Sequence, residues 1–297
     1  GEEENTLPNT MYITEDMASD LFGKKGKKIN KTLNKIDKKG IPKSFSVNAS
    51  VKFKVEKTSE VIQSENVLGF IKGTDLSNEI VVVSAHYDHI GFNDEEIFNG
   101  ADDDGSGTVA VLEIAEAMSK AAKLGKGPRR SILFLTVSGE EKGLLGSEYF
   151  ADIEPVFPLE SIVTDLNIDM VGRIDPEHEG DREYVYTIGS DFLSSDLHKI
   201  SESVAAEYSD IKLDYRYNST DDPNRFYYRS DHYNFAKHNI PVIFYFNGTH
   251  EDYHGAGDTV DKIQFDILEK RAKLVFHTLW EVANTDKAPE VDRVLEE

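Results

Sequence analysis

Five short polar segments of the sequence carry side chains that could hold a metal ion and move a proton. The chain has no cysteine, so any metal must be bound through His and carboxylate groups. Such nitrogen and oxygen ligands favour zinc as the leading candidate, and a Glu beside the ion can act as a general base. The segments are residues 86–89 (HYDH), 100–107 (GADDDGSG), 138–141 (SGEE), 167–170 (NIDM) and 252–254 (DYH).

Each segment also has an ordinary structural interpretation. His86 could be a structural residue at a strand end, and capping at a helix N-terminus explains one or two aspartates of 102–104 but not all three. Glu140 and Glu141 could open an acidic helix, or one could bind metal while the other acts as a base. Asp169 lies in an apolar run, where a carboxylate must be paired or coordinated. Only the segments together favour a metal site.

The apolar pattern predicts strands alternating with helices, which position these segments. This order is typical of an α/β fold, a three-layer α/β/α sandwich around a central mixed, mostly parallel sheet of about eight strands. In such sheets, binding sites form at the carboxyl ends of strands, where these segments fall. The predicted strands are 11–13, 46–57, 67–72, 80–85, 131–137, 161–168, 185–188, 213–217 and 241–246, and the predicted helices are 15–22, 106–124, 143–151, 194–208, 230–238 and 265–283.

The composition excludes several classes of protein. A net charge of −22 disfavours general binding to nucleic acid, whose phosphates are also negative. No stretch of about 18 apolar residues is present to span a membrane, and no signal peptide is recognisable. A lysine-rich stretch at 24–43 is interpreted as a solvated amphipathic or looped segment, with docking of an acidic partner as the alternative.

Taken in order, the motifs resemble those of the family twenty-eight zinc aminopeptidases, a group with two co-catalytic metals that includes bacterial leucine-type aminopeptidases and glutamate carboxypeptidases. The resemblance covers about residues 65–284. It rests on 84–91 (SAHYDHIG), 99–107 (NGADDDGSG), 138–150 (SGEEKGLLGSEYF), 167–173 (NIDMVGR), 230–235 (SDHYNF) and 253–263 (YHGAGDTVDKI).

The resemblance implies two Zn²⁺ ions per chain and a ligand set of five residues. Asp103 would bridge the two ions. His86 and Asp169 would complete the shell of one ion, and Glu141 and His254 that of the other. The peptide bond between Asp103 and the following Asp would be cis.

The resemblance also implies roles for residues around the ligands. Glu140 would be the general base, and Asp88 and Asp258 would lie just outside the ligand shell, with Asp88 orienting a ligand histidine. Tyr253 is a candidate donor to the oxyanion, and Tyr227 is its rival. The implied substrate is a peptide with a free N-terminus.

The resemblance further implies an exported protein, periplasmic or extracellular. Residues 1–45 would be the remnant or trailing edge of a protease-associated-type region, and 46–297 the di-zinc catalytic domain. Arg225 and Arg229 could select an acidic group on the substrate, although surface salt bridges with Asp221, Asp222 or Asp231 are the simpler expectation. Three alternatives stay open: a glutamate-type carboxypeptidase or dipeptidase, a single-zinc glutaminyl cyclase, and a non-catalytic receptor-like scaffold.

Overall fold

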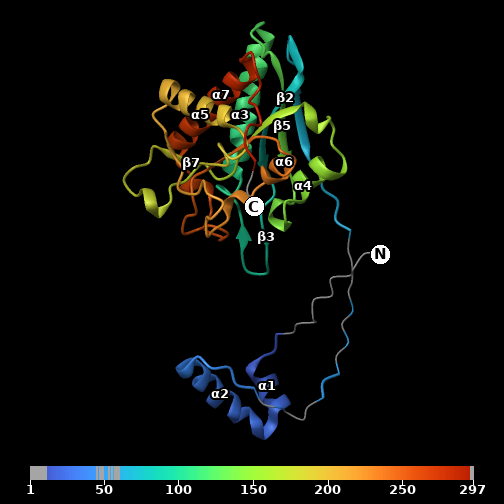
Figure 1. The fold of residues 1–297 in the computed structure, drawn as a ribbon, viewed down its shortest axis with the longest axis vertical. Coiled ribbons are helices and arrows are strands. Elements are labelled where there is room, and N and C mark those ends of the chain that lie inside the picture. Colours follow the sequence, from blue (N-terminus) through green and yellow to red (C-terminus); the bar gives the residue numbers. More distant parts are fainter. Residues whose placement is uncertain are drawn as a thin grey trace. The chain divides into compact units, whose positions relative to one another are not determined.

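The computed structural model describes residues 12–44, 46, 50–52, 54, 56 and 61–294. The chain divides into two compact units, Gly1–Ile62 and Gln63–Glu297. Figure 1 shows the elements of both units, and all the predicted metal-site residues belong to the second.

The first unit contains two helices, α1 (Glu15–Phe22) and α2 (Gly26–Lys39). α1 begins after a capping threonine: the Thr14 hydroxyl accepts a hydrogen bond from the Met17 N–H at 3.2 Å. Most of the lysine-rich stretch is helical in α2, which ends at Gly40 in the left-handed conformation. The stretch is therefore an amphipathic helix, as the simpler interpretation has it.

Two strands predicted for the N-terminal part do not form where the structure describes them. Tyr12 and Ile13 lie outside any strand, and Met11 lies outside the described residues. Residues 46, 50–52, 54 and 56 are exposed and irregular, whereas the rest of 46–57 lies outside the described residues. These described residues pair with no strand. An alternating pattern forms a strand only where a partner strand and a surface to pack on are available.

The second unit is built on a seven-stranded mixed sheet, so the predicted fold class is confirmed with one strand fewer than expected. The strand order is β1-β5-β2-β6-β9-β7-β8. The strands are β1 (Val67–Ile71), β2 (Leu76–His86), β5 (Arg130–Val137), β6 (Ile162–Ile168), β7 (Tyr184–Ile188), β8 (Lys212–Asp214) and β9 (Val242–Phe246). The sequence analysis did not predict a separate hairpin of β3 (Gly91–Phe92) and β4 (Ile97–Phe98).

The four central strands of the sheet run in the same direction. β5, β2, β6 and β9 are neighbours and pair in parallel, with Ser84 of β2 opposite Leu135 of β5 and Asn167 of β6. β1 and β7 join this block by antiparallel pairing, and β8 forms the far edge. The carboxyl ends of four neighbouring strands therefore lie along one edge of the sheet.

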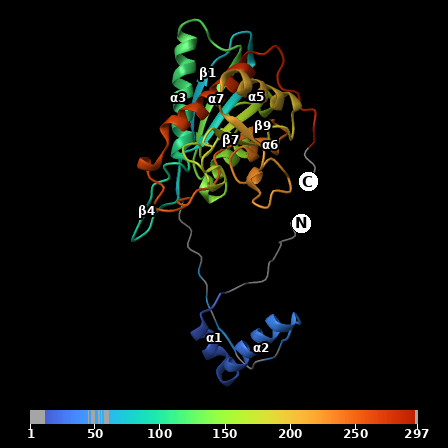
Figure 2. The same ribbon diagram turned by 90° about the vertical axis from the view of Figure 1, so that its left-hand side faces the viewer.

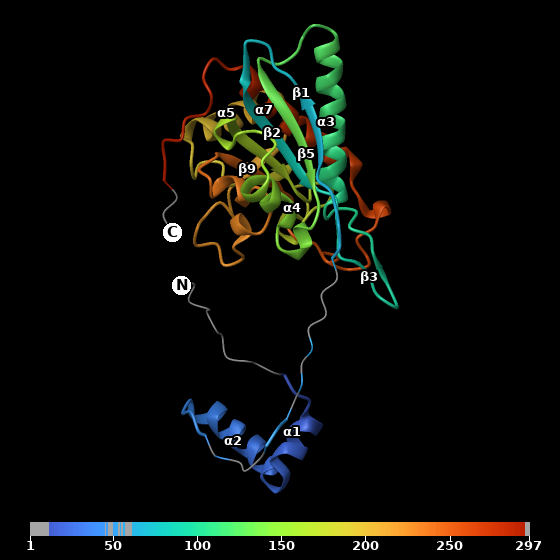
Figure 3. The same ribbon diagram turned by 90° about the vertical axis from the view of Figure 1, so that its right-hand side faces the viewer.

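Helices cover both faces of the sheet, as Figures 2 and 3 show. Residues of α3 (Gly105–Lys123), α5 (Ser195–Tyr208) and α7 (Phe265–Asn284) form one buried core cluster with Val81 and Val83 of β2. Val82 points to the opposite face because side chains alternate along a strand. On that face Val82 belongs to the same core cluster as Phe150 and Phe235. Phe150 follows α4 (Leu145–Glu148), and Phe235 lies in α6 (Tyr233–Ala236).

The second helical layer is thinner than the sequence pattern predicts. α4 and α6 have four residues each, where the prediction spanned 143–151 and 230–238. The turn Tyr149–Ile153 extends α4 with wider helical geometry. Within the described ranges, each helix is too short or too polar to cross a bilayer.

Candidate metal centre

The predicted ligands come together at the carboxyl edge of the parallel strands. His86 is the last residue of β2, and Asp169 directly follows β6. Glu141 lies in the turn Glu140–Lys142 after β5, and His254 lies in the loop after β9. Because these strands are parallel neighbours, residues far apart in the sequence converge at one place.

Asp103 lies between two imidazoles. Its Oδ1 is 3.2 Å from Nε2 of His86, and its Oδ2 is 3.2 Å from Nε2 of His254. The remaining carboxylates divide between the two sides, since Asp169 Oδ1 is 3.7 Å from His86 Nε2 and Glu141 Oε2 is 3.3 Å from His254 Nε2. One carboxylate thus faces two separate groups of donors. The expected cis peptide bond between Asp103 and Asp104 is present.

Asp104 has a structural role that removes it from the ligand set. Its oxygens lie within 4.8 Å of donors on His86 and Asp169, so distance alone allows it as a ligand. However, Asp104 is the N-cap of α3 and accepts the N–H of Gly107 at 2.9 Å, and it also accepts the N–H groups of Met170 and His86. With three backbone donors on its carboxylate, Asp104 holds loops together, and Asp103 is the better ligand.

Asp102 and Asp258 hold the aspartate loop in place. The Asp102 carboxylate accepts hydrogen bonds from the N–H of Gly172 at 2.7 Å, the Ser106 hydroxyl at 2.9 Å and the Asn247 amide at 3.1 Å. The Asp258 carboxylate accepts the N–H groups of Asp102 and Asp103 at 3.0 to 3.1 Å. The three consecutive aspartates therefore have three different environments, and only the middle one faces the two histidines.

His89 is a further histidine at the centre, and the sequence analysis gave it no role. Its Nδ1 lies 2.7 Å from Oε1 of Glu141 and 3.9 Å from Oδ2 of Asp103. Gly100, with φ of +63°, makes room for the ring, because a Cβ there would lie 2.5 Å from Cγ of His89. The signal in the sequence was the position of His89 in the same segment as His86, but spacing alone does not tell which side it faces.

Asp169 is tied to the core by a chain of polar groups. The Ser230 hydroxyl donates to Asp169 Oδ2 at 2.7 Å and accepts from the Asn167 amide at 2.9 Å. The Ser84 hydroxyl lies 2.8 Å from Asp165 Oδ1 and 2.9 Å from Asn167 Oδ1. A buried carboxylate after an apolar strand is thus partnered, as the sequence required.

Glu140 lies beside the ligands with its carboxylate free. Its N–H donates to Asp88 Oδ1 at 3.1 Å, and its Oε2 is 4.0 Å from His86 Nε2. Burial raises the pKa of Glu140 to about 10, and the negative charges of Asp169 and other acids add to this against the opposing effect of His86. A nearby cation would lower that pKa towards the neutral range, which suits a general base.

Asp88 contacts His86 mainly through its backbone. Nδ1 of His86 lies 3.0 Å from the Asp88 carbonyl oxygen and 3.7 Å from its carboxylate. The carbonyl is therefore the group that orients the imidazole and leaves Nε2 facing the carboxylates.

Unpartnered buried atoms show that the centre fits a cation. In the described part of the chain, His86 Nε2, Asp103 Oδ2, Glu141 Oε1 and both nitrogens of His89 are buried without a hydrogen bond. Burial lowers the pKa of His86, but the negative charge of Asp169 and the adjacent carboxylate of Asp103 outweigh this effect and raise that pKa well above the usual value. No lysine or arginine among these residues pairs with Asp103, Glu141 or Asp169. The missing positive charge is what a metal ion would supply.

The two candidate tyrosines have different surroundings. Tyr253 lines the pocket at the centre, and its ring stacks on His254 with centroids 3.9 Å apart. Burial raises the pKa of Tyr253, and so does the charge of Asp103, so its hydroxyl keeps its proton. Tyr227 is fully buried, packs against Phe192 and is not among the residues that line this pocket. The geometry favours Tyr253 as a donor over Tyr227.

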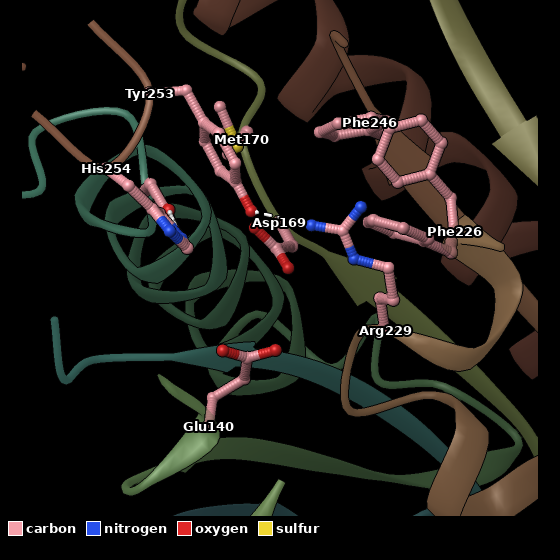
Figure 4. A pocket seen from close by; sticks show the side chains of 10 residues that line it. Glu140, Asp169, Met170, Phe226, Arg229, Phe246, Tyr253 and His254 are labelled. Carbon is pink, nitrogen blue, oxygen red and sulfur yellow. Dashed lines mark hydrogen bonds and ion pairs between the residues drawn. The ribbon is translucent and has the colours of Figure 1, made fainter. Parts of the chain in front are cut away.

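The pocket beside the metal-ligand cluster combines acidic, aromatic and basic groups. Figure 4 shows Arg229 reaching towards Asp169 beside Phe226. The residues that line it are Asp103, Glu140, Asp169, Met170, Phe226, Arg229, Phe244, Phe246, Tyr253 and His254.

The expected salt bridges of Arg225 and Arg229 are not formed. Asp222 accepts the N–H of Phe226, and Asp231 accepts the Ser147 hydroxyl. Arg225 stacks on Tyr228 and Arg229 on Phe226, and neither lies within 4.0 Å of a carboxylate in the described ranges. The nearby aspartates are engaged in holding their own loops.

Comparison with known proteins gives a match to one family model. The model of Peptidase family M28 matches residues 66–279. Leucine aminopeptidase 1 of Sclerotinia sclerotiorum is 32% identical over 216 residues, which cover 69% of this chain and 53% of the relative. Aminopeptidase YwaD of Bacillus subtilis is 27% identical over 233 residues, which cover 76% of this chain and 46% of the relative. The chain thus spans about half the length of these curated relatives.

A solved structure shows the same fold. The zinc aminopeptidase BSAP from Bacillus subtilis superposes with a TM-score of 0.60 at 24% identity, covering 78% of this chain and 53% of that one. Because the family model covers most of the sequence and every segment of the centre, the chain belongs to Peptidase family M28.

Proposed function

We propose that the chain is a zinc-dependent exopeptidase that hydrolyses the amino-terminal peptide bond of peptides. The observation that carries the proposal is the position of Asp103, whose two oxygens each lie 3.2 Å from a different histidine, His86 and His254. A carboxylate between two donor groups fits a bridging ligand of two metal ions. The names of the relatives, leucine aminopeptidase and zinc aminopeptidase, support the same reaction.

The donor set fits two zinc ions. One group of donors comes from His86, Asp103 and Asp169, and the other from Asp103, Glu141 and His254. Each group offers only nitrogen and carboxylate oxygen and leaves room for a further ligand, which is typical of catalytic zinc. When bound, zinc polarises a carbonyl group and lowers the pKa of a water molecule.

The residues of the chain would supply the proton transfer and the orientation. Glu140 has no ligand role in this arrangement and takes a proton from the attacking water, then delivers it to the leaving amine. Tyr253, which keeps its proton, donates a hydrogen bond to the oxygen on which negative charge develops. The apolar wall of Met170, Phe244 and Phe246 accommodates the side chain of the residue that is released.

The proposal is tested by counting metal ions and measuring peptidase activity on the same preparation. We expect close to two zinc ions per chain and cleavage of amino-acid anilides that have a free amine, with activity lost in chelator. Glu140→Gln should keep both ions and lose about 100-fold to 10,000-fold in kcat, whereas Glu141→Gln should lose an ion. Cleavage of amine-blocked peptides from the carboxyl end would instead favour a carboxypeptidase, and a metal-loaded protein without any peptidase activity would refute the proposal.

Export to the periplasm or the outside of the cell is part of the same proposal, and it is supported by the resemblance in the motifs. Fractionation of the producing cell, with detection by an antibody to the chain, tests it. Recovery with cytoplasmic markers alone would contradict it.

A further inference from the structure

Arg229 places a positive charge in the pocket, next to the candidate metal ligands. It lines the pocket together with Asp169 and Tyr253. Its Nη2 donates a hydrogen bond to the Tyr253 hydroxyl at 3.1 Å, and its guanidinium carbon lies 5.0 Å from the centre of the Phe226 ring. Figure 4 shows the guanidinium group directed into the pocket between the aromatic side chains and Asp169.

The guanidinium group of Arg229 has unused donors. Besides the bond to Tyr253, it makes only a long contact of 3.5 Å with the Asn224 carbonyl, through Nη1. Its Nε–H has no partner in the described part of the chain, and no carboxylate there lies within 4.0 Å. Other arginines of this acidic protein do pair with carboxylates, namely Arg129, Arg130, Arg173, Arg182, Arg216 and Arg293. An exposed arginine that lines the pocket and has no acidic partner is available for an anionic ligand.

The rest of the pocket wall restricts what that ligand is. Met170, Phe226, Phe244 and Phe246 are apolar, so they suit methylene groups and would be a poor environment for a phosphate or another multiply charged group. A ligand with a short aliphatic chain that ends in a carboxylate fits this pocket, because its methylene groups would contact the apolar walls and its carboxylate would contact the guanidinium group. The planar fork of Arg matches a carboxylate in shape as well as in charge.

We infer that Arg229 binds a carboxylate of the substrate, which makes it a residue that determines specificity; the inference rests on the proposed exopeptidase function. Two parts of a peptide could supply the carboxylate. One is the side chain of an amino-terminal Glu or Asp, and the other is the free carboxyl terminus of a dipeptide. In both cases the carboxylate forms charge-assisted hydrogen bonds with the free donors of Arg229.

The first arm of the test compares substrates that differ only in charge. We measure kcat/KM of the zinc-loaded protein for the anilides of Glu and Gln, which have nearly the same size and no free carboxyl terminus. The expected preference for Glu is about tenfold or more, as for other hydrogen bonds to a charged group. Arg229→Met should bring the ratio of kcat/KM for Glu to that for Gln down to about one, whatever its effect on the rate common to both substrates, and Arg229→Lys should restore part of the preference.

The second arm asks whether the carboxyl terminus is the source. It compares Leu-Gly with Leu-glycinamide in the same variants. A preference for the free acid that disappears in Arg229→Met, without a preference for Glu over Gln, assigns Arg229 to the carboxyl terminus of short peptides. Arg225→Met is the matched control, since Arg225 belongs to the same loop and stacks on Tyr228 but does not line the pocket. It should leave both preferences unchanged.

Two results would overturn the inference. If Arg229→Met lowers kcat by the same factor for all substrates, Arg229 only positions Tyr253. If it changes nothing, Arg229 has no role in recognition. Should the protein cleave no substrate at all, the proposed function fails separately, and calorimetric binding of glutamate against glutamine to the wild type and Arg229→Met still decides whether the pocket binds a carboxylate.

Discussion

Nδ1 of His89 lies 2.7 Å from Oε1 of Glu141, yet neither atom has a hydrogen-bond partner in the described part of the chain. The two atoms approach each other outside hydrogen-bond geometry, on the side of Asp103 that faces His254. Buried nitrogen and oxygen atoms that lie close together without a hydrogen bond between them are the arrangement expected of ligands around a cation. His89 therefore groups with Asp103 and Glu141 as a further candidate ligand, a role that its motif did not suggest.

Replacing His89 should weaken metal binding. We expect His89→Asn to reduce the affinity for one of the two ions by about tenfold to 100-fold, the usual effect of losing a group that supports a ligand. Competition with a chelator of known affinity measures it. His277→Asn is the control, because His277 stacks on Tyr208 in the helical layer, outside the pocket. Unchanged affinity for both ions in His89→Asn would show that His89 only fills space beside Gly100.

Removing the acceptor capacity of Asp258 should loosen the loop that carries Asp103. Both oxygens of Asp258 accept backbone N–H groups, of Asp102 and of Asp103. Asp258→Asn turns one oxygen into a donor that faces those N–H groups. We expect a loss of about 1 to 3 kcal/mol of unfolding free energy, measured by urea denaturation, together with weaker zinc binding. Asp261→Asn, at an exposed position nearby, should change neither.

Arg271 of α7 should be essential for the stability of the loop after Asp169. The side chain is 1% exposed, and its Nη1 donates to the carbonyls of Val171 at 2.9 Å and Arg173 at 2.7 Å. Its Nε donates to the carbonyl of Tyr184 at 2.8 Å. Arg271→Met would leave these buried acceptors without donors, and we expect a loss of roughly 3 kcal/mol or more.

Thermal and urea unfolding measure the effect of Arg271→Met. Lys273→Met on the exposed side of the same helix is the control, since Lys273 pairs with the exposed Glu269 and with no buried group in the described part of the chain. A loss of less than about 1 kcal/mol in Arg271→Met would mean that water replaces the guanidinium group in that space.

Acid should destabilise the fold through His232. Its ring is fully buried and stacks on Phe244 with centroids 4.8 Å apart, and burial lowers its pKa to about 3. The unfolded chain binds a proton at His232 below about pH 6.5, whereas the folded protein does so only near pH 3. The unfolded state thus binds more protons in this window, and the stability falls as the pH decreases from about 6.5 to 3.

His232→Phe should remove this part of the pH dependence. Between pH 7 and pH 4 the unfolding free energy of the wild type should fall by about 3 kcal/mol more than that of the variant. This value follows because each pH unit below the unfolded-state pKa of His232 contributes about 1.36 kcal/mol. Both are measured in chelator, so that release of metal at low pH does not contribute. Parallel curves for the two proteins would contradict the expected role of His232.

The sequence by itself determined the class of the fold and the residues that could bind metal. Runs of buried β-branched residues predict β2, β5 and β6, because such residues fit a strand covered on both faces. Polar segments after these strands predict a site at their carboxyl ends. Within these segments, the resemblance to the zinc aminopeptidases selected His86, Asp103, Glu141, Asp169 and His254 as ligands, and the structure brings them together.

Only the tertiary structure decided which neighbouring residue does what. Residue type and spacing alone do not distinguish Asp102, Asp103 and Asp104, because their roles depend on N–H donors from other loops, such as those of Gly172 and Met170. The sequence also did not show that Arg229 lacks an acidic partner, because this depends on the groups that Asp222 and Asp231 bind instead. The residues of a segment determine which conformation it prefers and which chemical groups it carries. Contacts between distant segments form only when the strands pair and bring those segments side by side.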